Sequence, residues 1–307
     1  SGKLTIPNKT IEIESEAFFG CFKFSELILS NKIESIGSSA FEGCSGFTGK
    51  LVLPNTLKKI GSDAFKDCSK FSDNLLIPDS IEVIESGTFK GCSGLAGNLT
   101  IPDSIKIIKS DAFNGCSNIK DELKLPESLT FIGSCSFKDC SKFSGNLTIP
   151  NSIQNVESGA FSGCSGFSGK LVIPSTIQSI KSDTFKGCSG FDGSLIIPDS
   201  IKFIESSAFD GCTKLSGTLK IPESVESIGS NAFRNCLRFS GNLMLPVSLN
   251  KIESGAFCGC SNFSGSLSIP SSLNVIESDV FNGCFGFNGE LKIPDSIETI
   301  GENAFKN

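Results

Sequence analysis

The chain contains no histidine, tryptophan or tyrosine among its 307 residues, and only one methionine. Without histidine there is no imidazole general base, which excludes Ser-His-Asp triads and Cys-His nucleophile pairs. His-ligated zinc and haem sites are excluded for the same reason. No run of about 18 apolar residues occurs, so the sequence predicts no transmembrane helix and no membrane insertion. We therefore predict no catalytic, metal-binding or cofactor-binding residue.

A strong charge of either sign is also absent. The chain has 27 basic and 33 acidic residues, a net charge of −6, and both signs are spread along the sequence. Such a distribution gives no basic patch that would attract a nucleic acid or an anionic membrane. The opening residues, SGKLTIP, do not resemble a signal peptide.

The prolines of the sequence recur at one regular spacing. From Pro54 to Pro294 a proline occurs every 24 residues, and Pro7 lies 47 residues before Pro54. Ser30 takes the place of the missing proline, in a repeat shortened to 23 residues. We therefore predict a single domain, residues 1–307, made of 13 stacked repeats, with no linker and with both ends inside a repeat.

The repeat at residues 164–187, CSGFSGKLVIPSTIQSIKSDTFKG, shows the pattern of one coil. Leu171 and Ile173 are two apart, which predicts a strand with both side chains inward and Val172 outward. Pro174 ends this strand because it cannot donate a ladder hydrogen bond. A second short strand is predicted at residues 177–180.

The second half of each repeat contains a nearly constant serine followed three residues later by a phenylalanine. A serine in this position predicts the N-cap of a one-turn α-helical or 3₁₀ segment. The Gly, Asp or Asn before each cysteine predicts a left-handed residue. No repeat can bury its apolar residues alone, so stacked repeats share one core around a parallel sheet.

These columns resemble the BspA-like leucine-rich repeat, a short, cysteine-bearing class, and residues 101–116, IPDSIKIIKSDAFNGC, are close to the family pattern. The resemblance implies a right-handed solenoid with a parallel sheet on one face. Family members are mostly surface-associated proteins of bacteria and protists, several of them linked to adhesion, and no catalytic residues come with the family. The resemblance thus implies a cell-surface or secreted location, and an intracellular location stays open.

Twelve of the 14 cysteines occupy one column, from Cys21 to Cys284. Stacked positions lie about 4.8 Å apart, whereas the Cβ atoms of a disulfide lie roughly 3.5–4.5 Å apart. Zinc needs four converging ligands, and a column is a line. We therefore expect a ladder of buried thiols. Cys258 replaces a residue that is polar in most other repeats, which predicts an exposed thiol.

Apolar residues in outward columns predict the binding surfaces. A solvated sheet face should be polar, yet the outer column of the first strand holds two apolar pairs, and the second strand holds an apolar run on three successive coils. Contiguous exposed apolar residues indicate an interface, although β-propensity alone or a column tilted inward would also explain them. The candidate residues are Val52 with Leu76, Val172 with Ile196, and the run Val83, Ile107 and Phe131.

Four Asn-x-Ser/Thr sequons mark candidate glycosylation sites: Asn8, Asn98, Asn146 and Asn262.

Two hypotheses of function follow. The first is a non-enzymatic adhesion module that presents a solenoid face to a protein or glycan. The alternative is a structural fibre or scaffold element that self-associates end to end, because neither end of the sequence resembles a capping repeat.

Overall fold

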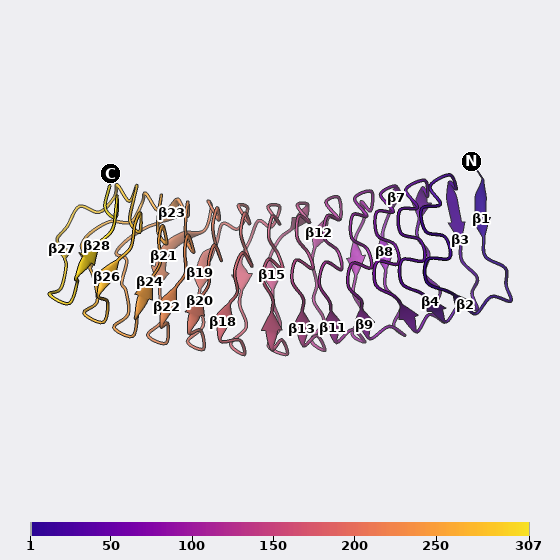
Figure 1. The fold of residues 1–307 in the computed structure, drawn as a ribbon, viewed down its shortest axis with the longest axis horizontal. Coiled ribbons are helices and arrows are strands. Elements are labelled where there is room, and N and C mark those ends of the chain that lie inside the picture. Colours follow the sequence, from indigo (N-terminus) through magenta and orange to yellow (C-terminus); the bar gives the residue numbers. More distant parts are fainter. Residues whose placement is uncertain (1, 307) are drawn as a thin grey trace. The chain divides into compact units, whose positions relative to one another are not determined.

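The protein, described from residue 2 to residue 306 by a computed structural model, divides into two units by its internal contacts. Unit 1 comprises Ser1–Ser144 with Ser152–Asn155, and unit 2 comprises Gly145–Asn151 with Val156–Asn307. Each unit is a parallel β-solenoid whose coils carry short strands (Figure 1). The prediction of one array of 13 repeats stays a prediction.

Most strands in unit 1 are two residues long, because each coil turns again after the proline or the serine. The strands of the first row lie at the predicted first strand of each repeat or just before it, upstream of the proline position. They are β1 (Lys3–Thr5), β3 (Glu26–Ile28), β5 (Gly49–Lys50), β7 (Phe71–Ser72), β8 (Leu75–Leu76), β10 (Leu99–Thr100), β12 (Asp121–Glu122) and β14 (Phe143–Ser144). The second row holds β2 (Glu12–Ile13), β4 (Ser35–Ile36), β6 (Lys59–Ile60), β9 (Val83–Ile84), β11 (Ile107–Ile108) and β13 (Phe131–Ile132).

Unit 2 has the same two rows. The first holds β15 (Leu147–Thr148), β17 (Leu171–Val172), β19 (Ser194–Ile196), β21 (Ser216–Lys220), β23 (Arg238–Phe239), β25 (Leu267–Ser268) and β27 (Leu291–Lys292). The second holds β18 (Ser179–Ile180), β20 (Phe203–Ile204), β22 (Ser227–Ile228), β24 (Lys251–Ile252), β26 (Val275–Ile276) and β28 (Thr299–Ile300). β16 (Asn155–Val156) contains the sequence boundary between the units.

Strands one repeat apart pair in parallel and in register, as Leu75 does with Leu99. Leu171 and Ile173 are buried while Val172 is exposed, which confirms the predicted direction of the first strand. Ile177 and Ile180 are buried as predicted for the second strand. Single-residue alternation thus sets which face of the strand enters the core.

The register slips where the Gly-rich return enters the first strand. Gly49 pairs with Phe71, and Asp121 with Phe143, so these partners are 22 residues apart instead of 24. Both Gly49 and Asp121 have positive φ, at 78° and 68°. Their left-handed conformation changes the direction of the chain at these points. In unit 1 the strands of the first row form two-stranded sheets only.

The core of each unit is built on stacked phenylalanine rings. In unit 1, Phe65 stacks on Phe41 with ring centroids 5.4 Å apart and on Phe89 at 5.7 Å, with interplanar angles of 9° and 1°. Phe71, from a second aromatic column, meets Phe65 edge-on at 6.4 Å. Both geometries are favourable for aromatic pairs, so the repeated phenylalanine couples each coil to its neighbours.

The predicted one-turn helix after the serine is wrong: no helix occurs between residues 2 and 306. Asp63 and Asp67 have φ of 56° and 59°, and a left-handed residue every four positions prevents a right-handed helix. The Lys66 N–H donates back to Asp63 O (3.0 Å), whereas the N–H groups of Asp63 and Phe65 donate to the next coil. The prediction of a left-handed residue before the cysteine is confirmed at Asp67.

Candidate binding surface

The two apolar pairs in the first-strand column are exposed. In unit 2, Val172 of β17 and Ile196 of β19 lie directly opposite each other in register, and 44% and 72% of their surfaces are exposed. In unit 1, Val52 and Leu76 are 62% and 49% exposed. Val52 lies two residues beyond β5, outside any strand, so the structure gives no register pair between Val52 and Leu76. Of these two pairs, Val172 and Ile196 are the one that the structure joins as register partners on adjacent strands.

The second-strand run is not an exposed apolar surface. Val83, Ile107 and Phe131 do lie side by side on β9, β11 and β13, in register (Figure 1). Each of the three is half-buried. Large side chains stacked one coil apart cover one another in part, so this run is less exposed than the first-strand pairs.

Two exposed apolar residues of the first-strand column were missed as patch members. Met244 is 74% exposed, and Ile28 is 40% exposed and paired with Thr5. Ile28 precedes Ser30 by two residues, as Val52 precedes Pro54. Counting back from the proline column through the shortened repeat would therefore have identified it.

Unit 1 also carries two open grooves where the first row of strands is interrupted. The larger, of about 740 Å³, lies between β3 and the segment 48–54 that contains β5, and residues lining it include Ile28 and Val52. The other, of about 530 Å³, is named here the Asp121 groove. Its walls are residues 98–101 with Asp103 on one side and 121–122 with 124–126 on the other.

The cysteine column faces the interior. The Cys68 and Cys92 side chains are fully buried, and their thiols donate to the carbonyl oxygens of Phe41 (3.1 Å) and Phe65 (3.0 Å) in the preceding coil. Burial raises the pKa of the Cys44 thiol to about 11. These thiols therefore stay protonated at neutral pH and act as hydrogen-bond donors in the core.

Cys258 is half-buried instead of exposed. Burial raises the pKa of its thiol, and the positive charge of Arg234 opposes that effect only in part. Because the thiolate is the reactive form, both facts argue against an exposed, reactive thiol at this position.

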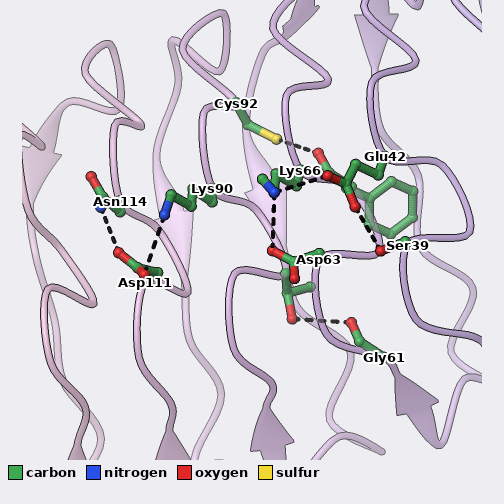
Figure 2. Close-up of polar contacts among 11 residues, drawn as sticks. Ser39, Glu42, Gly61, Asp63, Lys66, Lys90, Cys92, Asp111 and Asn114 are labelled. Carbon is green, nitrogen blue, oxygen red and sulfur yellow. Dashed lines mark hydrogen bonds and ion pairs between the residues drawn. The ribbon is translucent and has the colours of Figure 1, made fainter. Parts of the chain in front are cut away.

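Ion pairs connect successive coils on the turn side of unit 1. Figure 2 shows the Lys66 ammonium pointing to Glu42, 2.8 Å away, and Lys90 pointing to Asp111 at 3.3 Å. Burial raises the pKa of the Glu42 carboxyl, but hydrogen bonds from Lys66 and Ser39 outweigh burial and lower that pKa overall. These charged side chains pair with one another between successive coils, so this face stabilises the stacking of the coils. The strand face is therefore the better candidate for binding a partner.

All four sequon asparagines are exposed. Asn98 and Asn146 directly precede β10 and β15, and the Asn146 side chain accepts a hydrogen bond from the Lys170 N–H at 2.7 Å. Asn262 lies in the turn after Cys260. Glycosylation at these positions stays a prediction.

Metal-binding clusters and membrane-spanning helices are two other features to consider in the described chain. No group of three or more His, Cys, Asp or Glu side chains there could hold a metal ion. Nor does any helix between residues 2 and 306 have the length and apolar character to span a membrane.

Comparison with known proteins gives consistent results. The family model described as "BspA type Leucine rich repeat region (6 copies)" matches residues 2–120, 96–193 and 191–307. A leucine-rich repeat protein from Bacteroides ovatus is 27% identical, with a TM-score of 0.64, over 97% of this chain and 76% of that chain. The pneumococcal vaccine antigen PcpA is 20% identical, with a TM-score of 0.55, over 97% and 77%.

A leucine-rich cell surface protein from Faecalibacterium prausnitzii is 18% identical, with a TM-score of 0.51, over 96% of this chain and 88% of that chain. None of the curated proteins compared with the chain matches it.

Proposed function

The chain belongs to the BspA-type leucine-rich repeat family, and from this premise we propose that it is a non-enzymatic binding module, on a cell surface or secreted, that holds a protein partner on its strand face. The family supports this location, as do relatives such as the F. prausnitzii protein, which is described as a cell surface protein. Of the two sequence hypotheses, the exposed Val172–Ile196 pair supports the adhesion module.

The observation that carries the proposal is the Val172–Ile196 pair. Two β-branched side chains stand directly opposite each other on adjacent strands and are exposed to solvent. Leaving them in water forgoes the stabilisation of burial, of the order of 25 cal/mol per Å² of apolar area. A protein interface recovers that energy through apolar contact, whereas a glycan offers mainly hydroxyl groups. The patch therefore favours a protein over a glycan.

The test uses the double variant Val172→Lys with Ile196→Lys and a panel of purified host-matrix proteins alongside a glycan array. Affinity for the protein partner should fall about tenfold or more, since a central apolar contact contributes about 2 kcal/mol or more to binding. Biolayer interferometry measures the affinity, and far-UV circular dichroism checks that the solenoid is still folded.

Ser165→Lys is the matched control, because it adds a positive charge to the repeat that carries Val172 but on the exposed turn after Cys164. This variant should bind like the parent protein. Unchanged affinity of the double variant would contradict the patch. Binding to the glycan array alone would contradict a protein partner.

A further inference from the structure

The Asp121 groove in unit 1 exposes one edge of β10. On its other edge β10 pairs with β8, where the N–H groups of Leu75 and Ile77 donate to Asn98 O (3.0 Å) and Thr100 O (3.2 Å). Carbonyl and N–H groups alternate between the two edges of a strand in a parallel sheet. The N–H and C=O of Leu99 therefore face the groove.

The equivalent bonds to the next coil are missing at the groove. By analogy with Leu75 and Ile77, the N–H groups of Leu99 and Ile101 would donate to Glu122 O and Lys124 O, but in the described chain neither N–H donates across the groove. Two residues of strand span about 6.6 Å, which is also the spacing of every second carbonyl in an extended peptide. The edge thus offers the hydrogen-bonding pattern that a strand adds to.

The rim of the groove is acidic. Asp103, Asp121 and Glu122 line it, together with one lysine, Lys124. The volume of about 530 Å³ lies within the usual range of ligand sites, about 300–1,000 Å³. By contrast, the larger groove of unit 1 has one acidic and one basic lining residue, Glu26 and Lys50, and selects no sign of charge.

From these observations we propose that the Asp121 groove binds an extended peptide segment bearing lysine or arginine, which adds a strand to the free edge of β10. The backbone of the peptide pairs with the N–H groups of Leu99 and Ile101 and with the Leu99 carbonyl. Its basic side chains lie against the carboxylates of Asp121 and Glu122. This site gives the proposed binding module a second, separate contact, in the other unit from Val172 and Ile196.

The test is the binding of a fluorescein-labelled octapeptide, (Lys-Val)₄, followed by fluorescence anisotropy. An acidic counterpart, (Glu-Val)₄, should not bind measurably. Peptides N-methylated on every valine or on every lysine lose the donors of one edge, and at least one of them should bind about threefold to tenfold more weakly. Hydrogen exchange followed by NMR should show the amides of Leu99 and Ile101 slowed by the peptide.

The double variant Asp121→Asn with Glu122→Gln removes two charges, and asparagine tolerates the left-handed conformation of residue 121. Its affinity for (Lys-Val)₄ should fall about threefold to tenfold. Glu290→Gln is the control, because Glu290 is the exposed equivalent of Glu122 seven repeats further on, in unit 2, and it should bind like the parent protein.

Because the chain has no tryptophan, Thr100→Trp supplies a single reporter at the groove, and its emission should shift with the peptide. Thr148→Trp, on β15 paired with β17, should not respond. Equal binding of (Glu-Val)₄, no effect of N-methylation, or unprotected Leu99 and Ile101 amides would overturn the proposal. None of these outcomes bears on the Val172–Ile196 patch, whose own variant should keep full affinity for the peptide.

Discussion

At the scale of single residues, the cysteine column does more than fill space. The sequence predicted buried thiols, and the structure adds their acceptor, the carbonyl of the phenylalanine in the preceding coil. That carbonyl also accepts the N–H of its own turn, as Phe65 O does from Cys68 at 3.1 Å. The thiols that make this contact include Cys44, Cys68, Cys92, Cys116, Cys140, Cys188, Cys212, Cys236, Cys260 and Cys284.

The buried thiols predict a loss of stability in mild alkali. Burial raises the pKa of Cys44 to about 11 and of Cys284 to about 12, from an ordinary value of 9.0. The unfolded chain therefore loses its thiol protons first, so the stability is complete below pH 9 and is lost as the pH rises through the folded pKa values. The chain has no tyrosine or histidine, so neither residue type adds to this pH dependence.

The urea midpoint, followed by far-UV circular dichroism, should thus be lower at pH 10 than at pH 8. Cys44→Ala serves as the comparison: this variant is less stable at pH 8 but should lose less between the two pH values. A midpoint that stays constant from pH 8 to pH 10 would contradict the effect.

At the scale of elements, tandem turns with left-handed residues replace the expected helix. The expected helical turn and the observed tandem turns both place the phenylalanine three residues after the serine. Both also use N–H groups that donate to the carbonyl three residues back. The apolar spacing therefore does not separate them. What separates them is the Gly, Asp, Asn or Ser found one residue after the serine in most repeats, where φ is positive, as at Ser207 (φ 55°).

Ser207→Gly should stabilise unit 2. A left-handed conformation costs a residue with a Cβ about 1–2 kcal/mol, and glycine removes this cost. Against this gain, glycine gives the unfolded chain more freedom, which lowers the stability by about 0.4–1 kcal/mol. The expected gain in the free energy of unfolding is therefore about 0.5–1 kcal/mol, measured by urea denaturation. The Ser207 N–H bond to Ser230 O (2.8 Å) is retained in the variant.

Ser207→Ala keeps the Cβ and the strained φ, so it should give no gain. The reverse change at an equivalent glycine, Gly159→Ala (φ 68°), should lower the free energy of unfolding. A stabilised Ser207→Ala variant would assign the effect to the lost hydroxyl and contradict the backbone explanation.

The strands were predictable from sequence and the groove was not. Alternation at Leu171–Ile173 identifies a strand because a single residue step reverses its face. Residues 98–102 and 146–150, however, share the sequence NLTIP. β15, in the second segment, pairs with β17 of the next coil, whereas β10, in the first segment, borders the Asp121 groove on that side. The difference lies in the next coil, where β12 begins at left-handed Asp121 and pairs with β14 and not with β10. No pattern within one repeat contains that information.

At the scale of the whole molecule, the absent histidine predicts a stability that does not respond to pH near neutrality. Histidine is the only side chain whose ordinary pKa lies between pH 5 and 8. The carboxylates act at lower pH. A hydrogen bond from Lys251 lowers the pKa of Glu253, more than burial raises it, and Ser230 adds to the lowering.

The stability that Glu253 contributes is therefore present above its unfolded pKa, near 4.5, and is lost as the pH falls through the lower folded value. The urea midpoint should be the same at pH 6 and pH 8 and should fall between pH 4.5 and pH 3. Glu253→Gln should fall less over that acid range. A transition centred between pH 6 and 7 would contradict this prediction. The profile should be flat between pH 6 and pH 8 because no side chain of ordinary pKa in this chain titrates there.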